Sequence, residues 1–281
     1  MPEVRFVAPR WHDCFRPLPP NVRRVPFPDC LDETYDAVIE DDPRLPAFDA
    51  RAPVKVWLQH CEYNQGPELP RAMERATRVV TVSPHRRATM RHYGFDPRVR
   101  VIGFYFDVED WPQVEYGAGG AAGTAHNCMA INTEVRDLAE AIAQRLPLTV
   151  IGHRNGPVRG CRTVIPSGWN VFRKELGALS VWVYCVAGDQ LGMSPLEAMA
   201  CGLPVVMGTY PETGLFAFDD WNCCLARSAP FASVEWIAAR ARELLMDPEK
   251  REALGTAARA TIREFFPLPE CGRLWREALF A

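Results

Sequence analysis

Short runs of β-branched and apolar residues alternate with helix-like segments along the chain, and this alternation constrains the fold more than any other feature. In the first part the expected strands are 4–9, 21–27, 35–40, 54–60, 78–83 and 99–106, with helices at 68–77 and 84–93. In the second part the expected strands are 127–132, 148–153, 162–165, 181–186 and 204–207. The strands are nearly continuous apolar runs, as expected where helices cover both faces of a sheet. The pattern predicts an α/β protein with two parallel-sheet domains.

A Gly- and Ala-rich run at 114–126 suggests where the two domains meet. It fails as a dinucleotide fingerprint, because Ala122 stands where G-x-G-x-x-G needs its last glycine and no expected strand precedes it. That failure counts against an NAD-dependent oxidoreductase. We expect a flexible linker here, between an N-terminal domain at 1–113 and a second domain at 127–266. The last segment, 267–281, has one apolar face and is expected to pack back on the N-terminal domain.

Composition narrows the function classes without selecting one. The chain has 281 residues and a net charge of −3, so the chain as a whole does not have the charge of a nucleic-acid binder. The ten cysteines form no C-x-x-C pair and no His/Cys cluster at metal-ligand spacing, so we expect free thiols and no metal. No signal segment or membrane-length apolar run is apparent, which favours a cytoplasmic protein, with contact at the inner membrane face left open.

The stretch from Gly188 to Val206, GDQLGMSPLEAMACGLPVV, is the most informative local sequence. It predicts a loop, then a helix that ends at a glycine turn, and then a strand. Ser194 suits the N-cap and Pro195 the first helical position, while Gly202 suits the C-terminal stop. Because Glu197 comes three residues after Ser194, spacing alone favours a capping box in which Glu197 has only a structural role.

The loop before this helix supports a second interpretation. Gly188 and Gly192 permit a sharp turn and a close approach to a ligand, and the helix N-terminus would point at the carboxyl end of a parallel strand. Such a position binds anions, a diphosphate among them. Asp189 and Glu197 would then flank the anion, where carboxylates are suited to accept hydrogen bonds from the hydroxyl groups of a sugar or a ribose.

The same stretch resembles the E-x7-E segment of retaining GT-B glycosyltransferases of the GT4 type. LEAMACGLPVV matches closely, while the first acid is Asp189 instead of glutamate. Residues 76–111 and 247–266 are similar to further parts of that family. The resemblance implies a GT-B fold: two Rossmann-like domains facing a cleft, with C-terminal helices. It also implies a nucleotide-diphosphate sugar as donor, of the UDP or GDP type, bound by the second domain.

Residue roles follow from the resemblance alone. Glu197 would hold the ribose hydroxyls, Asp189 would contact the donor sugar, and the residues Gly192, Met193 and Ser194 would meet the sugar or the diphosphate. Aspartate is one methylene shorter than the usual glutamate, so its sugar contact could differ.

His60 ends the strand-like VKVWLQH and resembles a family histidine that faces the site, which makes it, with Asp189, a catalytic candidate. A structural or merely solvated histidine fits the same position. The family often places an arginine and a lysine after the first strand of the second domain, where this chain has Asn132 and Thr133. Arg154 or Arg136 could supply the positive charge, and we favour Arg154 because it follows a strand at the carboxyl edge.

The resemblance implies sugar transfer with retention of configuration, without a metal or another cofactor, in which the leaving phosphate accepts the proton of the acceptor. A protein of the same fold that binds nucleotide-sugars or a partner without catalysis is the alternative. The acceptor stays open among a lipid-linked glycan, a protein, a small molecule and DNA, and so does the oligomeric state. Eight arginines between Arg71 and Arg100 fit solvated helix faces, or a surface for an anionic partner.

Overall fold

The structure is a computed structural model. It describes residues 4–8, 21–26, 29–40, 49–59, 74–92, 99–117, 120–124, 133–152, 157–184, 192–210, 212–226 and 233–281. The chain divides into two compact units, of which unit 1 combines Met1–Gly103 with Pro269–Ala281 and unit 2 is Phe104–Leu268. Each unit contains parallel strands and helices, so the predicted α/β class is confirmed.

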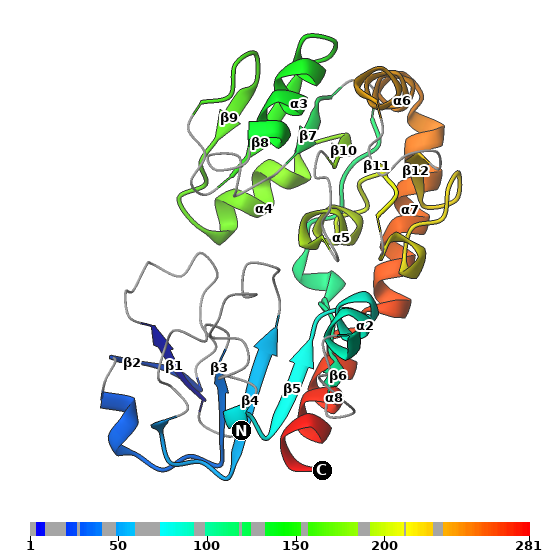
Figure 1. Ribbon diagram of the computed structural model, residues 1–281. Helices are drawn as coiled ribbons and strands as arrows, with labels where there is room; N and C mark the ends of the chain where they lie inside the picture. The colour runs from blue at the N-terminus through cyan, green and yellow to red at the C-terminus, as the bar shows by residue number, and fades with distance from the viewer. Residues whose placement is uncertain are drawn as a thin grey trace. The chain divides into compact units, whose positions relative to one another are not determined.

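Unit 1 contains a two-stranded and a four-stranded parallel sheet (Figure 1). The first pairs β1 (Val4–Ala8) with β2 (Val22–Pro26). The second has the order β3 (Ala37–Glu40), β4 (Val54–Gln59), β5 (Arg78–Thr81) and β6 (Val99–Val101). Before residue 104 the structure also describes a 3-10 helix, η1 (Asp29–Asp32), and helix α2 (Pro84–His92). The strand expected at 99–106 therefore ends early, and the helix expected at 68–77 lies mostly outside the described residues.

Helix α8 (Leu268–Phe280) belongs almost entirely to unit 1. Its Ala278 is fully buried. The Arg78 guanidinium, from β5, donates hydrogen bonds to the carbonyl oxygens of Glu277 and Ala278, at 3.4 and 2.5 Å. A cation at the carboxyl end of a helix satisfies carbonyls that have no partner within the helix. One of the eight clustered arginines thus has a structural role.

Unit 2 is built on a six-stranded parallel sheet with the order β12-β11-β10-β7-β8-β9. Its strands are β7 (Ala122–Thr124), β8 (Leu148–Ile151), β9 (Arg162–Val164), β10 (Val181–Val183), β11 (Val205–Gly208) and β12 (Cys223–Ala226). Its helices are α3 (Thr133–Ala143), α4 (Trp169–Gly177), α5 (Met193–Ala200), α6 (Val234–Met246) and α7 (Pro248–Phe265), with 3-10 helices η4 (Val108–Asp110) and η5 (Thr213–Leu215).

Strand β7 corrects the prediction of a linker at 114–126. Residues Ala122–Thr124 are buried and pair with both β8 and β10 in the middle of the sheet. At Gly123 a side chain would overlap that of Leu179, in the turn after α4, so glycine permits this turn to pack closely on the strand. The run looked like a linker because small residues have low strand propensity, whereas here they serve close packing. The strand expected at 127–132 lies outside the described residues.

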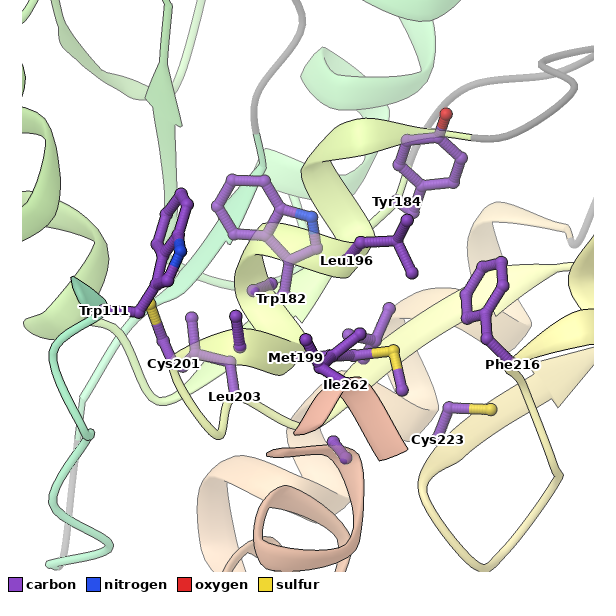
Figure 2. Packing of buried hydrophobic residues seen from close by; sticks show 14 of the residues in the cluster. Trp111, Trp182, Tyr184, Leu196, Met199, Cys201, Leu203, Phe216, Cys223 and Ile262 are labelled. Carbon is purple, nitrogen blue, oxygen red and sulfur yellow. The ribbon is translucent and has the colours of Figure 1, made fainter. Parts of the chain in front are cut away.

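Alternate residues of the sheet in unit 2 enter two separate cores. On β10, Val181 and Val183 face the side covered by α3 and α6, whereas Trp182 faces the side covered by α4, α5 and α7. Figure 2 shows the second core, where Trp182, Leu196 and Met199 lie together beside Ile262 of α7. Burial on both faces explains why the strands read as continuous apolar runs.

The segment Phe104–Gly117, here called the connector, leads the chain into unit 2. Phe106 donates its N–H to the Phe266 carbonyl at 2.8 Å, and Leu268 donates to the Phe106 carbonyl at 3.0 Å. The chain therefore enters and leaves unit 2 through two hydrogen-bonded segments. Three further connector residues, Val108, Trp111 and Val114, are buried in the core around α5. Within the described residues, no helix combines the length and the apolarity needed to cross a bilayer.

Candidate functional site

The strand order of unit 2 contains one switch point, between β7 and β10. From β7 the chain proceeds outward through β8 and β9, then returns to place β10 on the other side of β7 and continues through β11 to β12. In open parallel sheets, ligands bind outside the carboxyl ends of the strands at such a point. The helices that next follow β7 and β10 are α3 and α5, so the helix N-termini of Thr133 and Met193 lie at this edge.

Helix α5 begins two residues earlier than the sequence suggested. Its N-cap is Gly192, in an extended conformation, and Met193 is its first residue. The prediction of Ser194 as N-cap is therefore wrong, and both Ser194 and Glu197 lie inside the helix. Helices α6 and α7, in contrast, begin at Ser233 and Asp247, whose side chains accept hydrogen bonds from the N–H groups of Trp236 and Lys250. Like α4, which starts after Gly168, α5 has no side-chain cap.

Helix α5 is buried on all sides except along one stripe. Its five buried residues are Pro195, Leu196, Ala198, Met199 and Ala200. The others are Met193, which is 49% exposed, with Ser194 and Glu197, which are partly exposed. Residues three and four positions apart share one face of a helix, so Glu197 lies next to both Met193 and Ser194. The structure thus brings three of the predicted donor-binding residues together on the accessible face.

Gly192 lies directly against the aromatic ring of Tyr184, the residue that follows β10. A side chain at Gly192 would overlap the Tyr184 hydroxyl and the carbon that bears it. The φ angle of Gly192 is −65°, which any residue can adopt, so the need for glycine here comes from space and not from backbone strain. Tyr184 is buried in the same core as Leu196 (Figure 2). The ring therefore sets how closely the start of α5 approaches the end of β10.

The opposite end of α5 is anchored at three successive carbonyl groups. Arg259 of α7 donates to the Ala200 oxygen, the Val114 N–H donates to the Cys201 oxygen at 3.0 Å, and the Tyr116 hydroxyl donates to the Gly202 oxygen at 2.8 Å. Two of the three donors belong to the connector. Since carbonyls at the end of a helix have no partner within it, these bonds hold α5 in place.

Charges around α5 have a clear effect on one side chain, Cys201. Burial raises the pKa of the Cys201 thiol far above its ordinary value, and the nearby Glu197 carboxylate raises it further. The opposing effect of the Arg259 and Arg173 guanidinium groups is smaller. Cys201 therefore stays a protonated thiol at neutral pH and is not a nucleophile candidate.

The remaining predicted site residues divide into two sets. Thr133 is the exposed first residue of α3, at the edge where α5 also begins. His60, Asn132, Arg154 and Asp189 lie outside the described residues, so their predicted roles stay predictions. Arg136 donates a hydrogen bond to the Pro157 carbonyl at 3.0 Å and faces Glu140 at 3.9 Å. Tyr184 was not among the site residues predicted from the sequence. The signal that could have indicated it was an aromatic residue at the end of a buried strand.

Among the parts of the chain that the structure describes, no group of three or more His, Cys, Asp and Glu side chains is arranged to hold a metal ion. Five cysteines are free thiols: Cys161, Cys201, Cys223, Cys224 and Cys271. Burial raises the pKa of Cys161 and of Cys224 to about 11.

Comparison of the chain with known proteins gives one family and many structural matches. Residues 172–261 match the model of the family described as glycosyl transferases group 1. The matched segment begins within α4 and contains the whole of α5 and most of α7. No curated protein sequence matches the chain.

Several solved structures share the fold at low sequence identity. Sucrose-phosphate synthase from Thermosynechococcus elongatus has a TM-score of 0.69 and 16% identity, over 86% of this chain and 73% of that one. HepE from Anabaena, in complex with UDP-glucose, has a TM-score of 0.70 and 14% identity, over 87% and 78%. TarM has a TM-score of 0.68 and 14% identity over 87% of this chain, which spans only 55% of TarM. The chain therefore has the GT-B glycosyltransferase fold, and its residues 172–261 match the glycosyl transferases group 1 family.

Proposed function

We propose that this protein transfers a sugar from a nucleotide-diphosphate sugar to an acceptor hydroxyl, with retention of configuration and without a metal ion. The observation that carries the proposal is the position of α5. This helix lies within the segment that matches the glycosyl transferases group 1 family, begins at the switch point of the sheet, and exposes only Met193, Ser194 and Glu197. HepE, which has the same fold, contains UDP-glucose in its structure, and this supports a UDP-type donor.

Electrostatics at α5 suit a diphosphate. The dipole of a helix places partial positive charge at its N-terminus, where backbone N–H groups can bind phosphate oxygens. The Arg259 guanidinium at the opposite end adds a full positive charge near the carbonyls there. In the proposed reaction the acceptor oxygen bonds to the anomeric carbon as the bond to the diphosphate breaks. The acceptor proton passes to the leaving diphosphate, whose charge α5 stabilises by fixed dipoles.

Glu197 and Asp189 have different roles in this proposal. The carboxylate of Glu197, on the accessible stripe of α5, accepts hydrogen bonds from the ribose hydroxyls, while Asp189 contacts the donor sugar and His60 lines the site. Arg154, Asn132 and Thr133 are the candidates for contact with the diphosphate. Asp189→Ala should then reduce turnover more than nucleotide affinity, because its contact is made with the transferred group.

The experiment that tests the function measures thermal stability against UDP, GDP and a panel of their sugars. A ligand at a hundred times its dissociation constant should add about 2.7 kcal/mol of stability. Any stabilising donor is then incubated with the protein with and without EDTA, and the release of nucleoside diphosphate is measured. Stabilisation by none of these ligands would overturn the proposal, and loss of turnover in EDTA would overturn its metal-independent part.

A second candidate is a protein of the same fold that binds a nucleotide-sugar or a partner without catalysis. It is favoured by Asp189, which replaces the usual glutamate, and by Asn132 and Thr133 where the related family has basic residues. Stabilisation by a nucleotide-sugar, combined with no donor hydrolysis and no transfer, would select this candidate.

A further inference from the structure

Arg259 is an arginine of α7 whose side chain is 9% exposed. Its guanidinium donates to three carbonyls from two segments: Ala200 at the end of α5, and Val108 and Trp111 of the connector, at 2.7 and 3.5 Å. Its ion pair with the Glu109 carboxylate is long, at 3.8 Å, and the Glu109 side chain is 72% exposed. Arg259 is therefore held mainly by backbone oxygens.

Such an arrangement is costly unless the charge is well satisfied. Removing a guanidinium from water requires several strong hydrogen bonds in return, and a solvent-screened carboxylate at this distance contributes little. The planar fork of arginine spreads its donors over separate nitrogens in a fixed geometry, whereas lysine places three donors on one nitrogen. Only arginine is thus suited to hold the end of α5 and the connector at a fixed separation.

We propose that Arg259 is a positioning residue of the donor site: it ties the carboxyl end of α5 to the connector and thereby fixes where the N-terminus of α5 lies. The part of this proposal that concerns nucleotide affinity rests on the proposed function. Helix α5 has eight residues and is rigidly packed, so a displacement at Ala200 is carried to Gly192 and Glu197. Binding sites are sensitive to displacements of about 1 Å.

The chain contains a matched control in Arg251, the other buried arginine of α7. Arg251 is 1% exposed and donates to Leu244 and Leu245, at the end of α6, at 2.6 and 2.8 Å. It also donates to the connector at Tyr116 and Gly117. Arg251 thus ties a helix end to the connector in the same way, but the helix end is that of α6. At the connector it holds the backbone carbonyls of Tyr116 and Gly117, whereas the bond from Tyr116 to the end of α5 is made by its side-chain hydroxyl.

The test compares Arg259→Lys with Arg251→Lys in the full-length protein, using UDP and GDP as probes. Both variants should lower the melting temperature, because each leaves buried carbonyls without a donor. Titration calorimetry, performed well below both melting temperatures, should give roughly tenfold weaker nucleotide binding for Arg259→Lys. Arg251→Lys should bind within about twofold of the wild type. Arg259→Gln keeps a donor for one carbonyl, and it should weaken nucleotide binding as Arg259→Lys does.

Hydrogen exchange provides a readout that does not depend on nucleotide binding. Arg259→Lys should speed amide exchange in α5 and η4 and leave α6 unchanged, while Arg251→Lys should speed exchange at the end of α6 and leave α5 unchanged. The proposal is overturned if Arg259→Lys leaves both α5 exchange and nucleotide affinity as in the wild type, or if both variants weaken affinity equally. A wild-type protein that binds neither nucleotide contradicts the proposed function, while the exchange pattern still decides whether Arg259 holds α5.

Discussion

The two ends of helix α5 differ sharply. At the carboxyl end, the oxygens of Ala200, Cys201 and Gly202 each accept a hydrogen bond from α7 or the connector. At the amino end, Gly192 provides no side-chain cap, although α6 and α7 are capped by Ser233 and Asp247. A helix that is fixed at one end and left without a side-chain cap at the other is suited to bind a ligand with its N-terminal N–H groups.

The largest effect is expected where α7 crosses the anchored end of α5. At Gly255 of α7 a side chain would overlap the carbonyl oxygen of Gly202 and the ring of Tyr116. Because two backbones would have to separate, Gly255→Ala should lower the free energy of unfolding by about 2–3 kcal/mol. Denaturant unfolding measures this, with Gly272→Ala as the control, since no atom lies near a side chain at that exposed helical position. The control should be neutral or stabilising, and equal losses in the two variants would refute the close crossing.

At the amino end, Gly192→Ala should cost about 1–2 kcal/mol of stability, because the new methyl group overlaps the Tyr184 hydroxyl. Under the proposed function it should also weaken UDP binding, since the start of α5 must move. Adding Tyr184→Phe to the variant removes the hydroxyl and should restore part of the stability. If the single variant is as stable as the wild type, Tyr184 does not determine the position of Gly192.

The caps themselves should differ in their effect on stability. Ser233→Ala removes the side-chain cap of α6 and should lower the free energy of unfolding by about 1 kcal/mol. Ser194→Ala should change it by less than about 0.5 kcal/mol, because Ser194 lies inside α5 and is not its N-cap. Thermal unfolding of the two variants side by side measures the difference. If Ser194→Ala loses as much stability as Ser233→Ala, Ser194 caps α5 after all.

The smallest expected effect concerns the corner between α6 and α7. Hydrogen bonds from Lys250 and then Arg240 hold the pKa of the Glu243 carboxyl below its ordinary value. A lowered folded-state pKa adds stability above the unfolded pKa of about 4.3, and this stability is lost as the pH falls through the folded pKa. Since the groups are largely exposed, we expect about 0.5 kcal/mol. Glu243→Gln should show a correspondingly weaker loss of stability between neutral and acidic pH, and the difference should shrink in high salt.

Much of the fold could be predicted from the sequence, because its strands are apolar runs long enough to be recognised. The runs at 181–186 and 204–207 fall on β10 and β11, and Asp247 with Pro248 marks the start of α7. Strand β7 was missed because Ala122 and Gly123 have little hydrophobic signal of their own. Their burial comes from Leu179 and the neighbouring strands, which a local pattern cannot reveal.

The site was predictable in part. The stretch around Glu197 predicted a helix with an anion-binding start, and Met193, Ser194 and Glu197 do share its accessible face. The exact start of the helix was not predictable, because Ser194 and Pro195 favour a start two residues later than the one observed, where Gly192 packs on Tyr184. The anchoring by Arg259 was equally hidden, since it joins residues 59 and 151 positions apart.

The most direct test of the account is the affinity of UDP and GDP for the wild type and for Glu197→Gln, measured by titration calorimetry. Glu249→Gln, in the first turn of α7, is the control for removing a carboxylate near a helix start. We predict that the wild type binds one of the two nucleotides and that Glu197→Gln weakens this binding at least tenfold, or about 1.4 kcal/mol. Glu249→Gln should bind as the wild type does. Equal affinity in all three proteins would contradict a donor site on α5.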